Sequence, residues 1–155
     1  MAVPYRNPRL IIVDDDRGRY DELKRLLDDA PFKPELDIVT CPKCVSEALQ
    51  GPANAVLLDY DLDGIGYCAK CGRDWCSEDR RAQPLNMPWG AKGSDWVEKL
   101  DPKLPVIVVS ANRHGSKYIH KLLIDRQFWS VAVISALEVQ SELRWLGQLW
   151  LWGCL

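Results

Sequence analysis

The stretch from Ala55 to Gly64, which reads AVLLDYDLDG, decides the fold of this chain. Its first four residues are apolar and lack helical spacing, and carboxylates and a glycine follow them at once. This pattern is typical of a short strand that is buried on both faces of a sheet. Such a strand delivers its carboxylates, beginning with Asp59, to one edge of the sheet. We therefore expect the functional site at that edge.

Two further segments have the same form. Residues 10–13, LIIV, precede the aspartates of residues 14–16, and residues 106–109, VIVV, precede the polar segment Ser110–Asn112. In a parallel sheet, the carboxyl ends of neighbouring strands meet at the same edge. The sequence therefore predicts one polar site that is built from three strand ends.

Strand-like and helix-like segments alternate along the whole chain. The expected strands are residues 10–13, 36–40, 55–59, 106–109 and 129–134, and the expected helices are residues 16–30, 45–50, 93–100, 114–127 and 136–152. Five such alternations are typical of an open parallel sheet with helices on both faces. We therefore predict an α/β fold, a flavodoxin-like three-layer sandwich with a five-stranded parallel sheet in the order 2-1-3-4-5. In this order the ligand site lies between strands one and three.

Length and composition limit the remaining classes. With 155 residues and 47% hydrophobic content, the chain is expected to form a single domain over residues 1–155. The formal net charge of -2 gives no general attraction to nucleic acid or to an anionic membrane, so bulk binding to either is not expected. The sequence has no signal-peptide pattern and no run of about 18 apolar residues, so we expect a cytoplasmic protein.

Residues 62–92 interrupt the alternation of strands and helices. This stretch holds three cysteines, several glycines and two prolines, and it has no sustained period. We interpret it as an inserted loop of about 30 residues, and loops of this length in a compact domain are usually functional or held by another element. The cysteines are the obvious means of holding it.

The cysteines are spaced as metal ligands. Cys41 and Cys44 form one Cys-x-x-Cys pair, and Cys68 and Cys71 form a second. Two such pairs are typical of a structural Zn²⁺ site with four thiolate ligands. Cys76 is the alternative ligand, in place of Cys41 or Cys44. Free buried thiols and a disulfide are the competing interpretations, and a disulfide is disfavoured in a reducing compartment.

The carboxylates at the predicted edge need a counter-charge. Asp14, Asp15 and Asp59 would repel one another there unless they were protonated or neutralised, and a hard divalent cation is the usual solution. We predict Mg²⁺, which prefers one or two carboxylates together with phosphate oxygens and therefore implies a phosphorylated partner. Ser110 and Asn112 could donate hydrogen bonds to the other phosphate oxygens. Helix capping explains a single aspartate well, but it explains these three together poorly.

The strand-end motifs resemble the receiver domains of two-component response regulators. The segments IIVDDD at residues 11–16, LLD at residues 57–59 and VVS at residues 108–110 carry this resemblance. It implies that Asp14 and Asp15 bind Mg²⁺ and that Asp59 accepts a phosphoryl group. Receivers carry a lysine at the end of strand five, and this sequence has none there.

A closer resemblance is to the cyclic-phosphate-processing receiver domains. LDYDL at residues 58–62 is similar to their Leu-Asp-His-Asp-Leu motif, and SANRHG at residues 110–115 is similar to their Ser-x-Asn-Pro-x-Gly motif. Three positions differ: Tyr60 stands for the histidine, Arg113 for the proline, and Val109 for a histidine before the serine.

This closer resemblance implies a metal-dependent phosphoesterase that acts on cyclic phosphates. Asp59 or a metal-activated water would attack phosphorus, and Ser110 and Asn112 would hold the oxyanions. Asp61 would serve as general base. The substrate would be a phosphorylated small molecule or a nucleic-acid end.

A non-catalytic module is the competing hypothesis. An atypical response-regulator receiver could keep the pocket and act in signalling by protein–protein contact. The expected last helix, residues 136–152, favours this hypothesis because its leucines and tryptophans cover more than one face. It would be buried in a homodimer, form a docking surface, or serve as a tryptophan-rich core helix.

Overall fold

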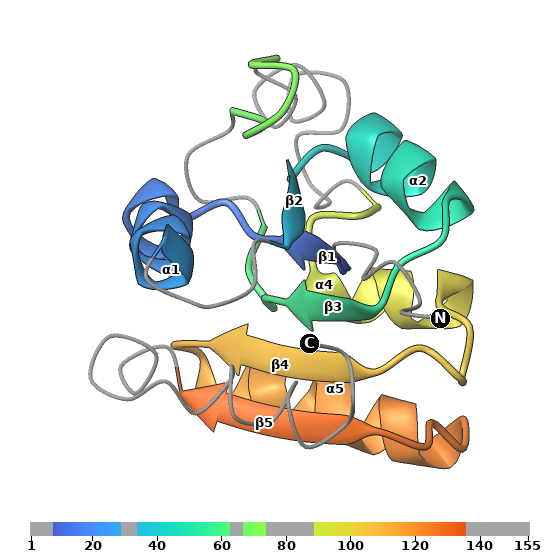
Figure 1. Cartoon of the computed structure of the whole chain (residues 1–155). Helices are drawn as coiled ribbons and strands as arrows, with labels where there is room; N and C mark the ends of the chain where they lie inside the picture. The colour runs from blue at the N-terminus through green and yellow to red at the C-terminus, as the bar shows by residue number, and fades with distance from the viewer. Residues whose placement is uncertain (1–7, 29–33, 63–66, 74–88, 136–155) are drawn as a thin grey trace, which may run out of the picture.

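The computed structural model describes residues 8–28, 34–62, 67–73 and 89–135. Five parallel strands form one sheet in the order β2-β1-β3-β4-β5 (Figure 1). The strands are β1 (Arg9–Val13), β2 (Glu35–Val39), β3 (Ala55–Leu58), β4 (Val106–Ser110) and β5 (Val131–Ser135). The predicted fold class and the predicted strand order are both confirmed.

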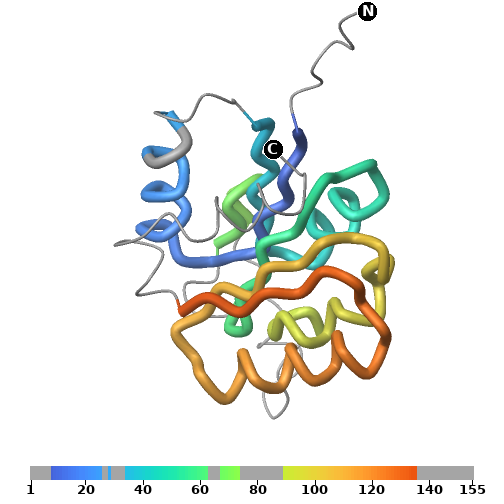
Figure 2. Tube along the Cα trace, turned by 60° about the horizontal axis from the view of Figure 1, so that its bottom comes forward, coloured from blue at the N-terminus to red at the C-terminus, as the bar shows by residue number. Residues whose placement is uncertain are grey.

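Helices cover both faces of the sheet. They are α1 (Arg17–Asp28), α2 (Pro42–Gln50), α4 (Gly93–Trp96), which continues into the 3-10 turn η1 (Val97–Lys99), and α5 (Arg113–Asp125). α2, α4 and α5 contribute to one hydrophobic core, and α1 contributes Leu23 to the core on the opposite face. Figure 2 shows α4 and α5 side by side along the same face of the sheet.

The central strands are apolar because both of their faces are covered. All residues of β3 and β4 are buried, and so are the last four residues of β1. Side chains of a strand alternate between faces, so each of these strands supplies both cores. This explains why their sequences are continuous apolar runs that lack an alternating pattern.

The register of the strands brings the predicted polar segments together. Val13 of β1 pairs with Leu58 of β3 and also with Val39 of β2. The next residues along these three strands are Asp14, Asp59 and Thr40, so they leave the sheet side by side. Parallel pairing thus places the ends of β1, β2 and β3 at one edge, and β4 ends there as well.

Several element boundaries differ from the sequence prediction. The helix expected at residues 45–50 begins three residues earlier, at Pro42, because Cys41 has an extended backbone and acts as the N-terminal cap residue. Proline suits this first helical position, since its missing N–H would have no partner inside the helix. The first cysteine pair is therefore part of a helix start, whereas the prediction placed it in a turn before the helix.

Parts of the prediction lie outside the described residues. These are Cys76, the expected helix at residues 136–152 with its homodimer interface, and most of the expected loop at residues 62–92. In the part of the chain that the structure describes, no helix is long and apolar enough to cross a membrane.

Candidate functional site

An acidic pocket lies where β1, β3 and β4 end. Asp59 lines this pocket and Asp14 lies next to Asp59. Both are almost fully buried, with exposed fractions of 3% for Asp14 and 4% for Asp59. The pocket has a volume of about 240 Å³, and its lining residues are Asp15, Asp16, Arg19, Asp59, Asp61, Ser110, Ala111 and Asn112. The structure thus brings the predicted site residues of three strand ends to one place.

Three of these acids are arranged so that they could hold a metal ion. Asp14, Asp15 and Asp59 each offer one carboxylate oxygen, and these oxygens lie within 4.8 Å of one another. Hard cations such as Mg²⁺ take oxygen ligands at about 2.0–2.1 Å, so two ligands of one ion are at most about 4.2 Å apart, and small side-chain shifts would bring these oxygens onto one ion. The donor set therefore fits the Mg²⁺ ion that the sequence predicts.

Arg19 lines the pocket, and the sequence analysis did not identify it. It lies in the first turns of α1, and its Nη1 is 3.0 Å from Asp14 Oδ2 and 3.2 Å from Asp59 Oδ2. The same nitrogen donates to the carbonyl oxygen of Val109 at 3.4 Å, at the end of β4. One guanidinium therefore connects the ends of three strands.

A signal for Arg19 was present in the sequence. Arg19 stands four residues before Leu23, and residues at this spacing share one face of a helix. Leu23 is an apolar residue of this helix and is buried in the core, and Arg19 lies on the same face. An arginine on the buried face of a helix next to three aspartates indicates an ion pair.

Burial controls the protonation of the two central acids. Burial raises the pKa of Asp14, the neighbouring carboxylate of Asp59 raises it further, and Arg19 opposes both effects. Burial also raises the pKa of Asp59, although Arg19 and a hydrogen bond with Ser110 act in the opposite direction. Both carboxylates are therefore costly to keep ionised in the metal-free protein.

Asp61 is held at the rim of the pocket by two donors. Lys92 Nζ lies 2.6 Å from Asp61 Oδ1, and Asn112 Nδ2 donates to Asp61 Oδ2 at 3.0 Å. Burial raises the pKa of Asp61, but these two contacts outweigh it and lower the pKa below its usual value. A carboxylate that holds its charge so firmly is a weak general base. The predicted catalytic role of Asp61 stays a prediction.

Asn112 has a structural role in addition to its place in the pocket. Its Oδ1 accepts a hydrogen bond from Gly115 N at 2.8 Å and so caps α5. Its Nδ2 is the donor to Asp61, so both ends of the amide have protein partners. Its backbone N–H also donates to Ser110 Oγ at 3.1 Å. The predicted contact of Asn112 with a phosphate oxygen stays a prediction.

A glycine allows the close packing behind Asp59. A Cβ atom at Gly93 would lie 1.8 Å from the carbonyl oxygen of Asp59, so no other residue fits at the start of α4 without a backbone shift. Gly93 N donates to the carbonyl oxygen of Tyr60 at 2.6 Å, which ties α4 to the segment after β3. Gly93 thus fixes the backbone that carries the central acid.

A cluster of four cysteines lies beside the acidic pocket. It consists of Cys41 and Cys44 at the start of α2 and of Cys68 and Cys71 in the described part of the predicted loop, and their sulfur atoms lie within 4.8 Å of one another. All four are free thiols in the structure. The sequence prediction named the same four cysteines, and the structure brings them together.

The spacing of the sulfurs suits a tetrahedral ion. Cys41 Sγ lies 3.8 Å from Cys71 Sγ. A Zn²⁺ ion with four Zn–S bonds of about 2.3 Å gives sulfur–sulfur edges of about 3.8 Å. Burial raises the pKa of Cys68, but backbone hydrogen bonds outweigh it and lower the pKa to about 6. One thiol is therefore already disposed to bind as thiolate.

Thr40 connects the cysteine cluster with the acidic pocket. Its side chain is 1% exposed, and its hydroxyl donates to the carbonyl oxygen of Asp14 at 2.8 Å. The same hydroxyl accepts a hydrogen bond from Ala69 N, between the second pair of cysteines, at 3.2 Å. A single buried hydroxyl thus links the backbones of the two sites.

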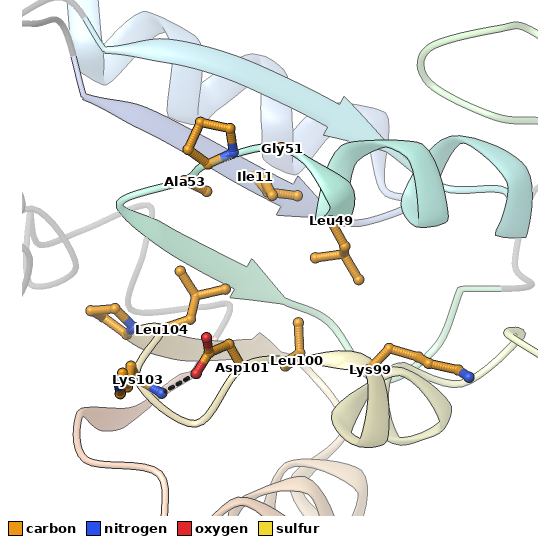
Figure 3. Close-up of a pocket in the computed structure, with 11 residues that line it drawn as sticks. Ile11, Leu49, Gly51, Ala53, Lys99, Leu100, Asp101, Lys103 and Leu104 are labelled. Carbon is orange, nitrogen blue, oxygen red and sulfur yellow. Dashed lines mark hydrogen bonds between the residues drawn. The ribbon is translucent and has the colours of Figure 1, made fainter.

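Another cavity lies at the opposite edge of the sheet. Figure 3 shows it between the segment that follows α2 and the segment that leads into β4, with a volume of about 360 Å³. Leu49, Leu100 and Leu104 line it together with Lys99 and Lys103. No cluster of acids or thiols accompanies these residues among those described, so this cavity contributes no candidate chemistry.

Comparisons with known proteins agree with this architecture. No family model matches the sequence, and no curated protein matches it. The chain is similar to the solved structure of the phosphorylated cyanobacterial phytochrome response regulator RcpA, with a TM-score of 0.56, 15% identity, and coverage of 94% of this chain and 95% of that chain.

Two further solved structures give the same result. One is a CheY-like response regulator receiver domain protein from Methanospirillum hungatei JF-1, with a TM-score of 0.52, 15% identity, and coverage of 92% and 97%. The other is the bacteriophytochrome response regulator AtBRR, with a TM-score of 0.51, 13% identity, and coverage of 92% and 94%. At these identities the likeness shows the fold: this chain has the fold of a response-regulator receiver domain.

Proposed function

We propose that this chain is a receiver-like signalling domain that binds a divalent cation at Asp14, Asp15 and Asp59 and accepts a phosphoryl group on Asp59. One observation carries the proposal: three carboxylate oxygens lie within 4.8 Å of one another where strands β1 and β3 of a receiver fold end. The proposed output is contact with a partner protein, because the fold is the one used by response regulators.

The residues of the pocket suit phosphoryl transfer. Asp59 lines the pocket, so a donor phosphate can approach its carboxylate. An Asp59 oxygen would form the new bond to phosphorus while the bond between phosphorus and the donor's leaving group breaks. When bound, Mg²⁺ supplies charge neutralisation at the phosphoryl oxygens. The Ser110 hydroxyl is hydrogen-bonded to Asp59, and it would turn from the Asp59 carboxylate to donate to one of these oxygens.

We also propose that the four clustered cysteines hold a structural Zn²⁺ ion. The support is the set of four thiols within 4.8 Å and the 3.8 Å edge between Cys41 and Cys71. Such an ion would fix the loop that carries Cys68 and Cys71 against the start of α2. It would have no part in the phosphoryl chemistry, because four thiolates leave no open coordination position.

Phosphoester processing at the same pocket is the second candidate. Asp61, Ser110 and Asn112 line one cavity with Asp59, which is the arrangement that the resemblance to cyclic-phosphate-processing receivers implies. The substrate would be a small cyclic phosphate or a nucleic-acid end. The low pKa of Asp61 weighs against this candidate, since it weakens the proposed general base.

One experiment separates the two functions. The protein is incubated with Mg²⁺ and ³²P-labelled acetyl phosphate, and separately with Mg²⁺ and a panel of 2′,3′-cyclic nucleotides. We expect label on the protein from acetyl phosphate and no ring opening of the cyclic nucleotides. Turnover of a cyclic nucleotide that is lost on Asp59→Asn would favour the second candidate. The absence of both reactions would contradict both.

A further inference from the structure

We propose that Arg19 is a resident counter-ion that competes with the divalent cation for Asp14 and Asp59 and thereby sets the cation affinity of the pocket. This inference rests on the proposed function, since it concerns the same site. Arg19 was in no predicted site, and its role follows from where the fold places it.

The contacts of Arg19 are those of a built ion-pair network. Its side chain is 10% exposed, and its guanidinium also reaches Asp16, with Nη2 at 3.4 Å from Asp16 Oδ2. The backbone N–H of Arg19 donates to Asp16 Oδ1 at 3.1 Å, which caps α1 and fixes the start of the side chain. The start of α1 therefore fixes the position from which the Arg19 guanidinium reaches the pocket.

In each of the two central carboxylates, one oxygen is hydrogen-bonded to the backbone and the other contacts Arg19. Asp14 Oδ1 accepts a hydrogen bond from Asp16 N, and Asp59 Oδ1 accepts one from Tyr60 N, both at 2.8 Å. The remaining oxygens, Asp14 Oδ2 and Asp59 Oδ2, are the two that Arg19 Nη1 contacts. A divalent cation that binds Asp14 and Asp59 through these oxygens would displace the guanidinium or share them with it, and its positive charge would repel the guanidinium at either oxygen.

The charges around the pocket favour both Arg19 and a divalent cation as partners of the two central acids. A buried carboxylate that loses its partner is strongly destabilising, so Arg19 stabilises the metal-free protein by neutralising Asp14 and Asp59. Among the described residues at this site, the acids Asp14, Asp15, Asp16, Asp59 and Asp61 outnumber the bases Arg19 and Lys92, so an excess of acidic groups remains with Arg19 in place. The residual charge attracts a divalent cation, while Arg19 raises the free energy needed to seat it.

The test is a titration of the full chain with Mn²⁺, a spectroscopically visible substitute for Mg²⁺, followed by electron paramagnetic resonance. Three proteins are compared: wild type, Arg19→Gln and Arg17→Gln. Arg17 is the matched control, because it lies on the same helix but is 82% exposed and pairs with Asp21 at 3.7 Å. We expect Arg19→Gln to bind Mn²⁺ at least about tenfold more tightly than wild type, and Arg17→Gln to bind within about twofold.

Thermal unfolding gives a second measurement. Without metal, Arg19→Gln should unfold at a lower temperature than wild type, because two buried carboxylates lose their counter-ion. With saturating Mn²⁺ the difference should shrink or reverse, since the ion then takes over the neutralisation. Arg17→Gln should follow wild type under both conditions.

The outcomes separate this inference from the proposed function. Equal or weaker Mn²⁺ binding by Arg19→Gln, with clear binding by wild type, would overturn the competition alone. No Mn²⁺ binding by folded wild type and folded Arg19→Gln would overturn the cation site and this inference together. If Arg19→Gln does not fold, the guanidinium N–H signals of wild type are followed by NMR while Mg²⁺ is added. A change of the Arg19 signals in step with Mg²⁺ binding supports the inference, and unchanged signals at saturation contradict it.

Discussion

Asp59 is a buried carboxylate, and burial disfavours its ionised form. Burial raises its pKa, and Arg19, Ser110 and the N–H of Tyr60 offset only part of this effect. In the metal-free protein, the ionised Asp59 carboxylate therefore reduces stability at neutral pH. A cation bound at Asp59, as proposed above, would remove this cost.

Asp59→Asn should therefore stabilise the metal-free protein while it abolishes phosphoryl acceptance. The amide has the shape of the carboxylate without its charge, so we expect a gain of about 1 kcal/mol, or about 2–4 °C in Tm. Thermal unfolding in a chelator measures this gain. A clear loss of stability would show that the ion pair with Arg19 outweighs the cost of burial.

Asp37 shows the opposite behaviour on the edge strand β2. Its carboxylate is paired with Arg9 Nη2 at 2.6 Å and with Lys70 Nζ at 2.5 Å. Burial raises its pKa, but these two hydrogen bonds outweigh it, so the pKa of Asp37 lies below its usual value. Asp37 thus anchors the segment between Cys68 and Cys71 to the sheet.

Asp37→Asn should destabilise the protein at neutral pH by about 1–3 kcal/mol, because two charge-assisted hydrogen bonds lose their anion. Since the folded pKa is lowered, this stability is present above the unfolded pKa of about 3.9 and is lost as pH falls through the folded pKa. Urea unfolding of both proteins from pH 7 to pH 3 measures the difference. Asp21→Asn is the control, since its pair with Arg17 is exposed. A difference that stays constant with pH would contradict the ion-pair assignment.

At the scale of elements, the start of α4 is fitted to the end of β3. Gly93 lies against the Asp59 carbonyl, and Gly115 in α5 lies against the Tyr60 ring, where a Cβ would come within 2.2 Å of the ring. α4 and α5 therefore approach the segment after β3 so closely that a residue with a Cβ atom would clash at either contact. Their glycines hold the acid in position without contacting a ligand.

Gly93→Ala should cost about 3 kcal/mol or more, because the added methyl group meets a backbone oxygen that cannot move without shifting β3. Gly18→Ala in α1 is the matched control. Its nearest neighbour would be Asp16 Oδ1 at 3.4 Å, so helix propensity alone should make it neutral or up to about 1 kcal/mol stabilising. Chemical denaturation of both variants tests the contrast. A Gly93→Ala protein of wild-type stability would contradict the packing described for α4.

The elements also show what sequence reasoning can and cannot reach. The strands were predictable because apolar runs that end in polar residues have few alternative explanations, and the strand order followed from the alternation with helices. The start of α2 was predicted too late, since Pro42 suggested a turn when it is the first helical residue. Local patterns locate elements well and their ends poorly, because the ends depend on capping contacts.

The acids and thiols of the candidate site could be predicted from the sequence. Its buried positive side chain, Arg19, was not predicted. Asp14, Asp59 and the cysteine pairs stand in short motifs with fixed spacing, so the sequence was enough to bring them together. Arg19 belongs to no motif: its spacing from Leu23 indicates the buried face of the helix, but its partners depend on how α1 leaves β1. The hydrogen bond from Asn112 Nδ2 to Asp61 Oδ2 likewise joins residues far apart in the sequence, so no local pattern predicts it.

At the scale of the whole molecule, a zinc ion in the cysteine cluster should stabilise the fold by holding the loop with Cys68 and Cys71 against the start of α2. Protein purified without added metal should carry about one zinc per chain by elemental analysis, and its removal by a chelator should lower the free energy of unfolding. Cys44→Ser should lose the zinc, whereas Cys76→Ser should keep it if the four clustered cysteines are the ligands. Clearly substoichiometric zinc, with all thiols freely titratable in the folded protein, would rule the site out.

The central claim is that Asp59 of this receiver fold accepts a phosphoryl group with the help of a divalent cation. The most direct test is intact-mass spectrometry of the protein after incubation with acetyl phosphate in Mg²⁺ or in EDTA. We predict a single adduct of about 80 Da on wild type in Mg²⁺, none in EDTA, and none on Asp59→Asn. Wild-type protein that stays unmodified in Mg²⁺, or an equal adduct on Asp59→Asn, would contradict the claim.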